Sequence, residues 1–271
     1  MKSKLMRSAV LAATLVGGVA QSGFAAAQSS DMKPGAWQFE ATPYLWMAGL
    51  KGNTQMGNLP NININESFSD IVKILDFGAM GTFEARKDRW GFLFDGIYMK
   101  LSDGMTASRT GPGPIGATAT ASANLTLKQT MLNGSVAYRV VEGTTPVDVI
   151  GGARYNKLDA TADIGISFFG PVGINPSATR SLSGDKSWTD AIVGARIQHP
   201  IADRWTLTGY ADGGGSSGSS TWQLAAGANY DYSKDVSFKF GYRAMKLDYN
   251  KNGFLFDVTM QGPYVGAAFR F

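Results

Sequence analysis

Apolar and polar residues alternate along ten segments of this sequence. The segments are residues 37–47, 76–87, 90–101, 124–140, 147–158, 188–198, 205–212, 221–232, 236–247 and 254–271. The second is the clearest, because Phe77, Phe83 and Ala85 share one parity while Glu84 and Arg86 take the other. Successive side chains of a strand point to opposite faces, so this alternation predicts ten strands. Residues 90–101 are apolar on both faces, and Asp95 assigns their aromatic parity to lipid.

The connections between these segments alternate in length. Residues 87–89, 142–146, 199–204 and 233–235 are short, whereas 48–75, 102–123, 159–187 and 213–220 are longer, with a fifth connection at 248–253. Barrels of the bacterial outer membrane have short periplasmic turns and longer external loops. We therefore predict that the long connections face outside and that both chain ends are periplasmic.

The last segment changes parity within itself. Phe254, Phe256, Val258 and Met260 are apolar at even positions, whereas the odd positions from Pro263 to Phe271 are apolar afterwards. A one-residue insertion would restore a single lipid-facing side, so we predict a β-bulge near Gly262-Pro263.

Together these patterns predict an all-β fold, a single antiparallel transmembrane β-barrel of about ten strands, with eight or twelve as alternatives. The first long connection differs from the others. Phe68, Ile71 and Leu75 follow helical spacing, and Ser67 with Asp70 resembles a capping box. We predict a short helix there, in the first external loop, which either covers the barrel, lies at the membrane interface or packs without a further role.

The N-terminus has the features of a secretory signal peptide. Lys2, Lys4 and Arg7 precede an apolar run at 9–20, and three alanines at 25–27 offer a cleavage site. The apolar run is shorter than the roughly 20 residues needed to span a bilayer. We assign 1–27 to the signal peptide and 28–271 to the barrel, whose net charge is then only +1.

Composition excludes several function classes. A nearly neutral mature chain lacks the clustered basic face expected of a nucleic-acid-binding protein. The absence of Cys excludes disulfides, thiolate catalysis and Cys-ligated metals.

The inward parity of the predicted strands collects charged residues. These are Glu40, Glu84, Arg86, Asp95, Arg139, Asp148, Arg154, Asp190, Arg196, Lys239 and Arg243. Acidic and basic groups are nearly balanced, whereas a charge-selective pore would have a ring dominated by one sign. We predict a network of ion pairs across the lumen, because charges removed from water persist only when paired. The sequence therefore favours a passive structural or narrow porin-like barrel; the alternative is a barrel whose outer rim binds or modifies a lipid or ligand.

Catalytic and metal-binding chemistry finds little support. The single His, His199, lies in a predicted periplasmic turn, away from the outer rim where a histidine base would act. Residues 248–253 resemble the start of an EF-hand loop, but the twelfth position is Thr259 instead of Glu, and Asn252-Gly253 indicates a hairpin. The Gly-rich run at 213–220 lacks the Lys-Ser/Thr of a phosphate loop and indicates a flexible external loop. We predict that the protein is not an enzyme and binds no cofactor or metal.

Five short motifs occur in the first hundred residues: Thr42-Pro43-Tyr44-Leu45-Trp46, Phe68-Ser69-Asp70, Leu75-Asp76-Phe77, Glu84-Ala85-Arg86-Lys87 and Arg89-Trp90-Gly91. They resemble a largely uncharacterised family of proteobacterial outer-membrane barrels. The ending also resembles the C-terminal signature of Gram-negative barrels, here Tyr264, Val265, Phe269 and Phe271. The resemblance implies an outer-membrane location, contact with outer-membrane lipids and recognition by the assembly machinery. It implies no catalytic or binding residue and leaves the oligomeric state open.

Overall fold

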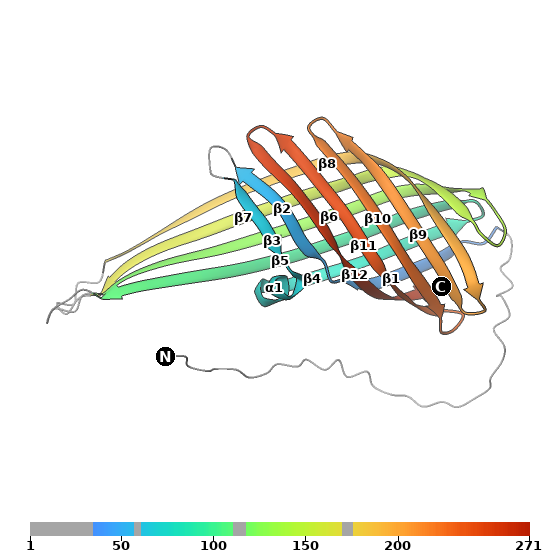
Figure 1. The fold of residues 1–271 in the computed structure, drawn as a ribbon, viewed down its shortest axis with the longest axis horizontal. Helices are drawn as coiled ribbons and strands as arrows, with labels where there is room; N and C mark the ends of the chain where they lie inside the picture. Colours follow the sequence, from blue (N-terminus) through green and yellow to red (C-terminus); the bar gives the residue numbers. More distant parts are fainter. Residues whose placement is uncertain (1–34, 57–60, 111–117, 170–175) are drawn as a thin grey trace, which may run out of the picture.

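The computed structural model describes residues 35–56, 61–110, 118–169 and 176–271, which form strands and one short helix (Figure 1). The predicted signal peptide lies outside these residues. The elements are β1 (Gln38–Trp46), β2 (Gly49–Met56), β3 (Ile62–Glu66), α1 (Phe68–Ile74), β4 (Leu75–Lys87), β5 (Trp90–Thr110), β6 (Thr118–Val141), β7 (Val147–Phe169), β8 (Ser177–Ala202), β9 (Trp205–Ser216), β10 (Ser219–Asp231), β11 (Val236–Lys251) and β12 (Phe254–Arg270).

Ten of these strands close into a ring. β1 pairs with β4, the strands from β4 to β12 pair in sequence order, and β12 returns to pair with β1. Every pairing is antiparallel, and Phe39 and Phe271 exchange two backbone hydrogen bonds where the ring closes. This confirms the predicted antiparallel barrel of about ten strands.

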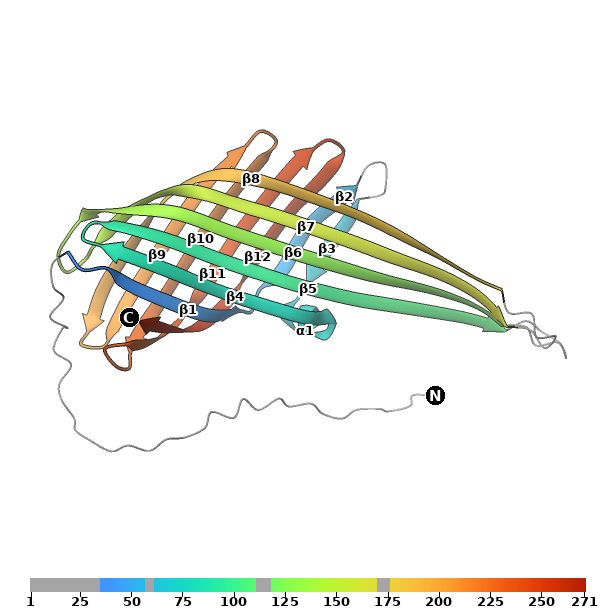
Figure 2. The same ribbon diagram turned by 180° about the vertical axis from the view of Figure 1, so that it is seen from behind.

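β1 and β2 lie in line along the edge of β12. The second half of β12 pairs with β1, and its first half pairs with β2. On the other side, β1 pairs with β4 only as far as Pro43, opposite Gly81. Proline has no N–H to donate to a ladder. Beyond Pro43, β2 pairs instead with β3, so the barrel wall divides between the β2–β3 hairpin and β4 (Figure 2).

The predicted helix lies where the wall divides. Ser67 is its N-cap, and the Ser67 hydroxyl accepts a hydrogen bond from the Asp70 amide. Ile71 is buried, and α1 contacts both β2 and β5. The helix therefore fills the seam between the hairpin and the main sheet. Among the described residues, no helix is long and apolar enough to cross a membrane.

The outside of the ring carries an apolar band. Large side chains such as Phe92 and Phe94 on β5 and Phe238 and Phe240 on β11 point outward and are exposed. Farther along the strands, charged residues follow this band on the outer face, beginning with Lys100 on β5, Lys128 on β6, Lys157 on β7 and Lys246 on β11. A continuous apolar band on a closed barrel is the surface that a lipid bilayer covers.

The predicted β-bulge near Gly262-Pro263 is wrong. β12 pairs with β11 in unbroken register from Phe254 to Phe269, so all its even positions face the lumen. Phe256, Val258 and Met260 are buried there instead of facing lipid. The prediction assumed that the apolar side of every strand faces the membrane. In this barrel, apolar side chains also fill the part of the lumen that the first half of β12 lines.

Two predicted loops are also largely strands. β5, β6, β7 and β8 contain 21, 24, 23 and 26 residues, so they extend through most of 102–123 and 159–187 (Figures 1 and 2). These extensions are rich in Ser, Thr and Ala, and the residues on their outer face are not predominantly apolar. The alternation of apolar and polar residues therefore does not identify them as strands. The Gly-rich run is likewise mostly strand, because Gly213–Ser216 belong to β9.

Candidate functional site

The lumen is built in layers, beginning at the end of the barrel that carries the short turns after β4, β6, β8 and β10. We call this the short-turn end. A cavity of about 860 Å³ opens there, lined by charged and polar side chains including Glu84, Arg196 and Lys239 and bounded higher up by Asp95 and Arg243. We call this cavity the vestibule.

Two carboxylates and three arginines bridge one side of the vestibule. Asp148 on β7 is almost fully buried and forms ion pairs with Arg86, Arg139 and Arg196 at 2.8–2.9 Å. Glu84 on β4 pairs with Arg196 at 2.7 Å and with Arg86 at 3.1 Å. Because β4 and β8 are not neighbours in the ring, the Glu84–Arg196 pair crosses the lumen.

A second group lies on the other side, where the ring closes. Glu40 on β1 pairs with Lys239 on β11 and with Arg270 on β12, the latter at 3.1 Å. Arg270 also pairs with Asp231 at 2.9 Å. These contacts connect the first and last strands of the ring through side chains as well as through the backbone.

Above the vestibule, buried polar residues form a layer that we call the septum. Arg154 is fully buried, and its guanidinium pairs with Asp212 at 2.7 Å. It also donates to the Asn133 side-chain oxygen at 2.7 Å and to the Thr221 hydroxyl at 2.6 Å. The charge is therefore paired and its donors are satisfied, which is the condition for burying an arginine.

Arg243 completes the septum. It pairs with Asp95 at 2.7 Å, donates to Tyr44 at 2.9 Å and donates to Gln223 at 2.7 Å. Its guanidinium also lies 4.8 Å from the centre of the Trp46 ring. Gln223 accepts from Arg154 as well, at 3.4 Å, so the two arginines belong to one network.

Asp190 departs from the predicted ion-pair network. Strand register places it opposite Arg154, but Arg154 turns to Asp212, and no described basic residue pairs with Asp190. Its carboxylate accepts hydrogen bonds from Trp188 Nε1 at 3.1 Å and from the hydroxyls of Ser216 and Ser219. The other ten residues of the predicted set all form ion pairs.

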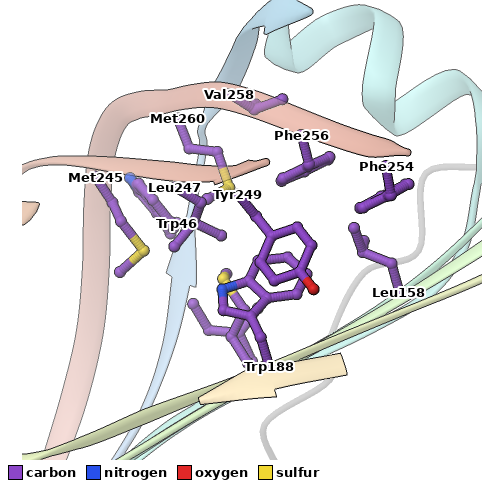
Figure 3. Packing of buried hydrophobic residues seen from close by; sticks show 12 residues of the cluster. Trp46, Leu158, Trp188, Met245, Leu247, Tyr249, Phe254, Phe256, Val258 and Met260 are labelled. Carbon is purple, nitrogen blue, oxygen red and sulfur yellow. The ribbon is translucent and has the colours of Figure 1, made fainter. Parts of the chain in front are cut away.

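The outer half of the lumen is apolar (Figure 3). Side chains from seven strands pack together there, and we call them the apolar plug: Trp46, Ile97, Met131, Leu158, Trp188, Met245, Leu247, Tyr249, Phe254, Phe256, Val258 and Met260. All twelve are at most 9% exposed. Asn156 lies where the plug meets the septum, and neither atom of its side-chain amide has a hydrogen-bond partner among the described residues.

Sequence reasoning missed several members of these layers. Asp212 follows Thr206, Thr208 and Tyr210 on one parity of β9, and extending that alternation could have identified it. Arg270 lies at an even position of β12, opposite in parity to Phe269 and Phe271, so the same alternation could have identified it. The plug carried no recognisable signal, because inward apolar residues alternate in the same way as lipid-facing ones.

The remaining candidates lie elsewhere. Val265 and Phe269 are on the outer face, Phe271 is 72% exposed, and Tyr264 points inward toward Gly241; recognition of these residues by the assembly machinery stays a prediction. His199 lies within β8 instead of in a turn, exposed near the short-turn end, with Nδ1 2.7 Å from the Thr145 hydroxyl. Asn252 and Gly253 both have positive φ, as expected of the predicted hairpin turn. The described residues hold no group of three or more metal-ligating side chains.

An exposed ion pair at the short-turn end provides a contrast to the septum. Arg89 Nε lies 2.8 Å from Glu142, and both side chains are about half exposed. The hydrogen bond from Arg89 lowers the pKa of the Glu142 carboxyl.

Comparison with known sequences identifies the family. Residues 123–271, more than half of the chain, match the family described as YfaZ precursor. The chain belongs to this family. The matched part of this YfaZ-family protein runs from β6 to the closing strand, so it includes both septum arginines. No curated protein sequence matches the chain.

The chain is similar to several solved structures at low sequence identity. The outer membrane protease OmpT from Escherichia coli has a TM-score of 0.55 and 11% identity, covering 90% of this chain and 100% of that one. Ail, the attachment invasion locus protein of Yersinia pestis, has a TM-score of 0.31 and 12% identity, covering 88% and 100%. Neisserial surface protein A has a TM-score of 0.33 and 14% identity, covering 87% and 97%. The OmpT likeness supports the barrel fold alone.

Fold, family and surface agree on the location. The antiparallel ring closes through the pairing of β1 with β4 and with β12, and a closed sheet is what spanning a bilayer with strands requires. This YfaZ-family protein is an outer-membrane β-barrel protein.

Proposed function

We propose that this protein is a passive barrel with a closed lumen, which conducts few ions and carries no catalytic activity. The septum is the observation that supports this most directly. Arg154, Asp212 and Arg243 are at most 6% exposed, which supports a mid-lumen without a water-lined path at their level. The apolar plug then fills the lumen above them.

Charge balance and strand number support the same proposal. A pore selective for one ion sign needs an excess of that sign along its wall. Here the buried carboxylates of Asp148 and Asp212 are paired with arginines, and that of Asp190 accepts hydrogen bonds from hydroxyls and an indole. Small barrels of about eight strands are filled by side chains, whereas open porins have 16 to 18 strands. A barrel of ten strands is close to the filled end of that range.

The position of His199 supports the absence of hydrolase activity. It lies on the outer wall near the short-turn end, and its Nδ1 is engaged with Thr145. The likeness to a protease rests on 11% identity and gives no reason to transfer that activity.

Planar-bilayer recording tests the proposal. We expect the purified protein to give no large, steady single-channel currents, and His199→Ala to leave this unchanged. A vestibule variant, Glu84→Gln, is the matched control, because it alters the polar cavity below the septum and should not open a path. Steady currents of general-porin size from the unmodified protein would refute the closed lumen.

A further inference from the structure

Four strands continue beyond the level at which the ring ends. β4 stops pairing with β5 at Leu101, and β9 stops pairing with β8 at Ala191. Residues 101–110, 118–127, 160–169 and 177–184 therefore form a four-stranded extension of the sheet, which we call the outer sheet (Figures 1 and 2). A tilted strand needs only about 9 to 11 residues to cross a bilayer, so the outer sheet lies outside the membrane.

The two faces of the outer sheet differ sharply in polarity. Register places Ala107, Ala121, Ile166 and Ala178 side by side on one face. The next row, on the opposite face, is Ser108, Thr120, Ser167 and Ser177. The apolar face continues the parity of Ile97 and Met131, so it is the face that continues into the lumen. Polarity is thus reversed relative to the membrane segment, where the outside is apolar.

Large apolar side chains that the structure describes are exposed on this inner face. Met105 is 73% exposed, Leu125 is 53% exposed and Phe168 is 50% exposed. A contiguous apolar patch that stands in water marks a binding surface for a ligand, protein or membrane. At its base it joins the plug, because Leu127 and Met99 pack against the plug residues.

The size of the face favours a small ligand over a protein. Ten residues along four strands span about 33 Å by about 19 Å, or roughly 600 Å². A stable protein interface buries about 800 Å² on each partner. The face is narrow and long, and its centre is formed by alanines, which leave a shallow floor for an extended chain.

Charge on the same face favours an anionic head group. Arg109 on β5 and Arg180 on β8 share the inner parity at the two edges of the sheet, and Lys186 follows on β8 with its Nζ 5.6 Å from the centre of the Tyr249 ring. Asp103 is the one acidic residue of this parity within the outer sheet. Arginine forks match carboxylate and phosphate oxygens.

We propose that the inner face of the outer sheet binds a single-chain amphiphile with an anionic head group. The chain lies on the apolar floor toward the plug, and the head pairs with Arg180 or Arg109 at an edge. This site goes beyond the closed-lumen function and does not depend on it, since binding needs no passage through the septum.

Photo-crosslinking with a diazirine-bearing palmitate tests the site on the full-length protein in nanodiscs. We expect crosslinks on inner-face residues such as Leu125 and Ile164. Leu182→Asp should reduce labelling several-fold, whereas Ser183→Asp, one residue away on the opposite face, should not. Both positions are exposed, so neither substitution disturbs the barrel core.

The head group is tested separately with the matching diazirine-bearing palmityl alcohol. Arg180→Glu combined with Arg109→Glu should reduce labelling by the acid and leave labelling by the alcohol nearly unchanged. Equal effects of Leu182→Asp and Ser183→Asp would overturn the site. Crosslinks that join two copies of the chain at Leu182 and persist when palmitate is added would also overturn the site, because the face would then be occupied by a second copy.

Discussion

Removing Arg154 tests the energetics of the septum. The guanidinium is fully buried and makes hydrogen bonds to Asn133, Thr221 and Asp212. Arg154→Met keeps much of the volume but leaves the Asp212 carboxylate with only the Tyr210 hydroxyl, 2.8 Å away. Breaking one member of a buried pair typically costs about 3–5 kcal/mol. We therefore expect the free energy of unfolding to fall by about that amount.

The exposed pair of Arg89 and Glu142 is the matched control. Both side chains are about half exposed, and pairs of this kind contribute about 0–1 kcal/mol. Arg89→Met should therefore lower the free energy of unfolding much less than Arg154→Met does. The two substitutions change the same residue type, so the difference between them measures the effect of burial.

Urea unfolding in phospholipid vesicles, followed by tryptophan fluorescence, gives both free energies. A double-mutant cycle of Arg154→Met and Asp212→Asn should show a coupling of about 2 kcal/mol or more, because adding the second change removes the unpaired charge. If Arg154→Met is no more destabilising than Arg89→Met, the septum is hydrated and the reasoning fails.

Three further outcomes follow from the same contacts. Arg196→Ala should destabilise the barrel only slightly, because Glu84 keeps its ion pair with Arg86, and Asp148 keeps its ion pairs with Arg86 and Arg139. Asp148→Ala should be strongly destabilising, because it removes a partner from three arginines. The urea midpoints of the two variants compare these effects. Asn156→Leu should raise the free energy of unfolding by about 1 kcal/mol or more, because the buried amide has no partner among the described residues, and a lower value would indicate that the amide is hydrogen-bonded in the membrane. Lys73 and Ser67 lower the pKa of Asp70 to about 2, so the stabilisation of α1 by the ionised Asp70 is complete above pH 4 and is lost as pH falls toward 2. An NMR titration of the Asp70 carboxyl should show a higher pKa in Lys73→Met. An unchanged pKa would contradict the ion pair.

The sequence predicted those parts of the fold in which one strand face meets lipid and the other meets charge. On β4, Phe83 and Glu84 differ so much in polarity that they show which side of the strand faces lipid and which faces the lumen. The same holds for Phe240 and Lys239 on β11. It failed where both environments are apolar. Phe256 and Met260 look like lipid-facing residues, and only the unbroken register with β11 shows that they fill the lumen.

Side-chain reach limited the prediction of the site in a different way. Inward parity brought together the correct charged residues, but it cannot specify which partner a long arginine selects. Arg154 lies beside Asp190 in register and pairs with Asp212 two strands away. Asp190 is satisfied by hydroxyls and an indole instead. Such choices depend on the width and curvature of the closed ring, which alternation along one strand does not contain.

The closing of the ring has a consequence for how the chain folds. β12 pairs with β11 through a tight turn, but its partners on the other edge are β1 and β2, and the Arg270–Glu40 contact joins residues 230 positions apart. Folding rates fall as contacts become less local, since the entropy of closing a long loop must be overcome before the contacts form. The hairpins from β4 to β11 can form early, whereas the pairing of β12 with β1 and β2 forms last. Until then the edges of β1 and β12 are unpaired, and the step that completes the barrel is also the step most exposed to mispairing with another chain.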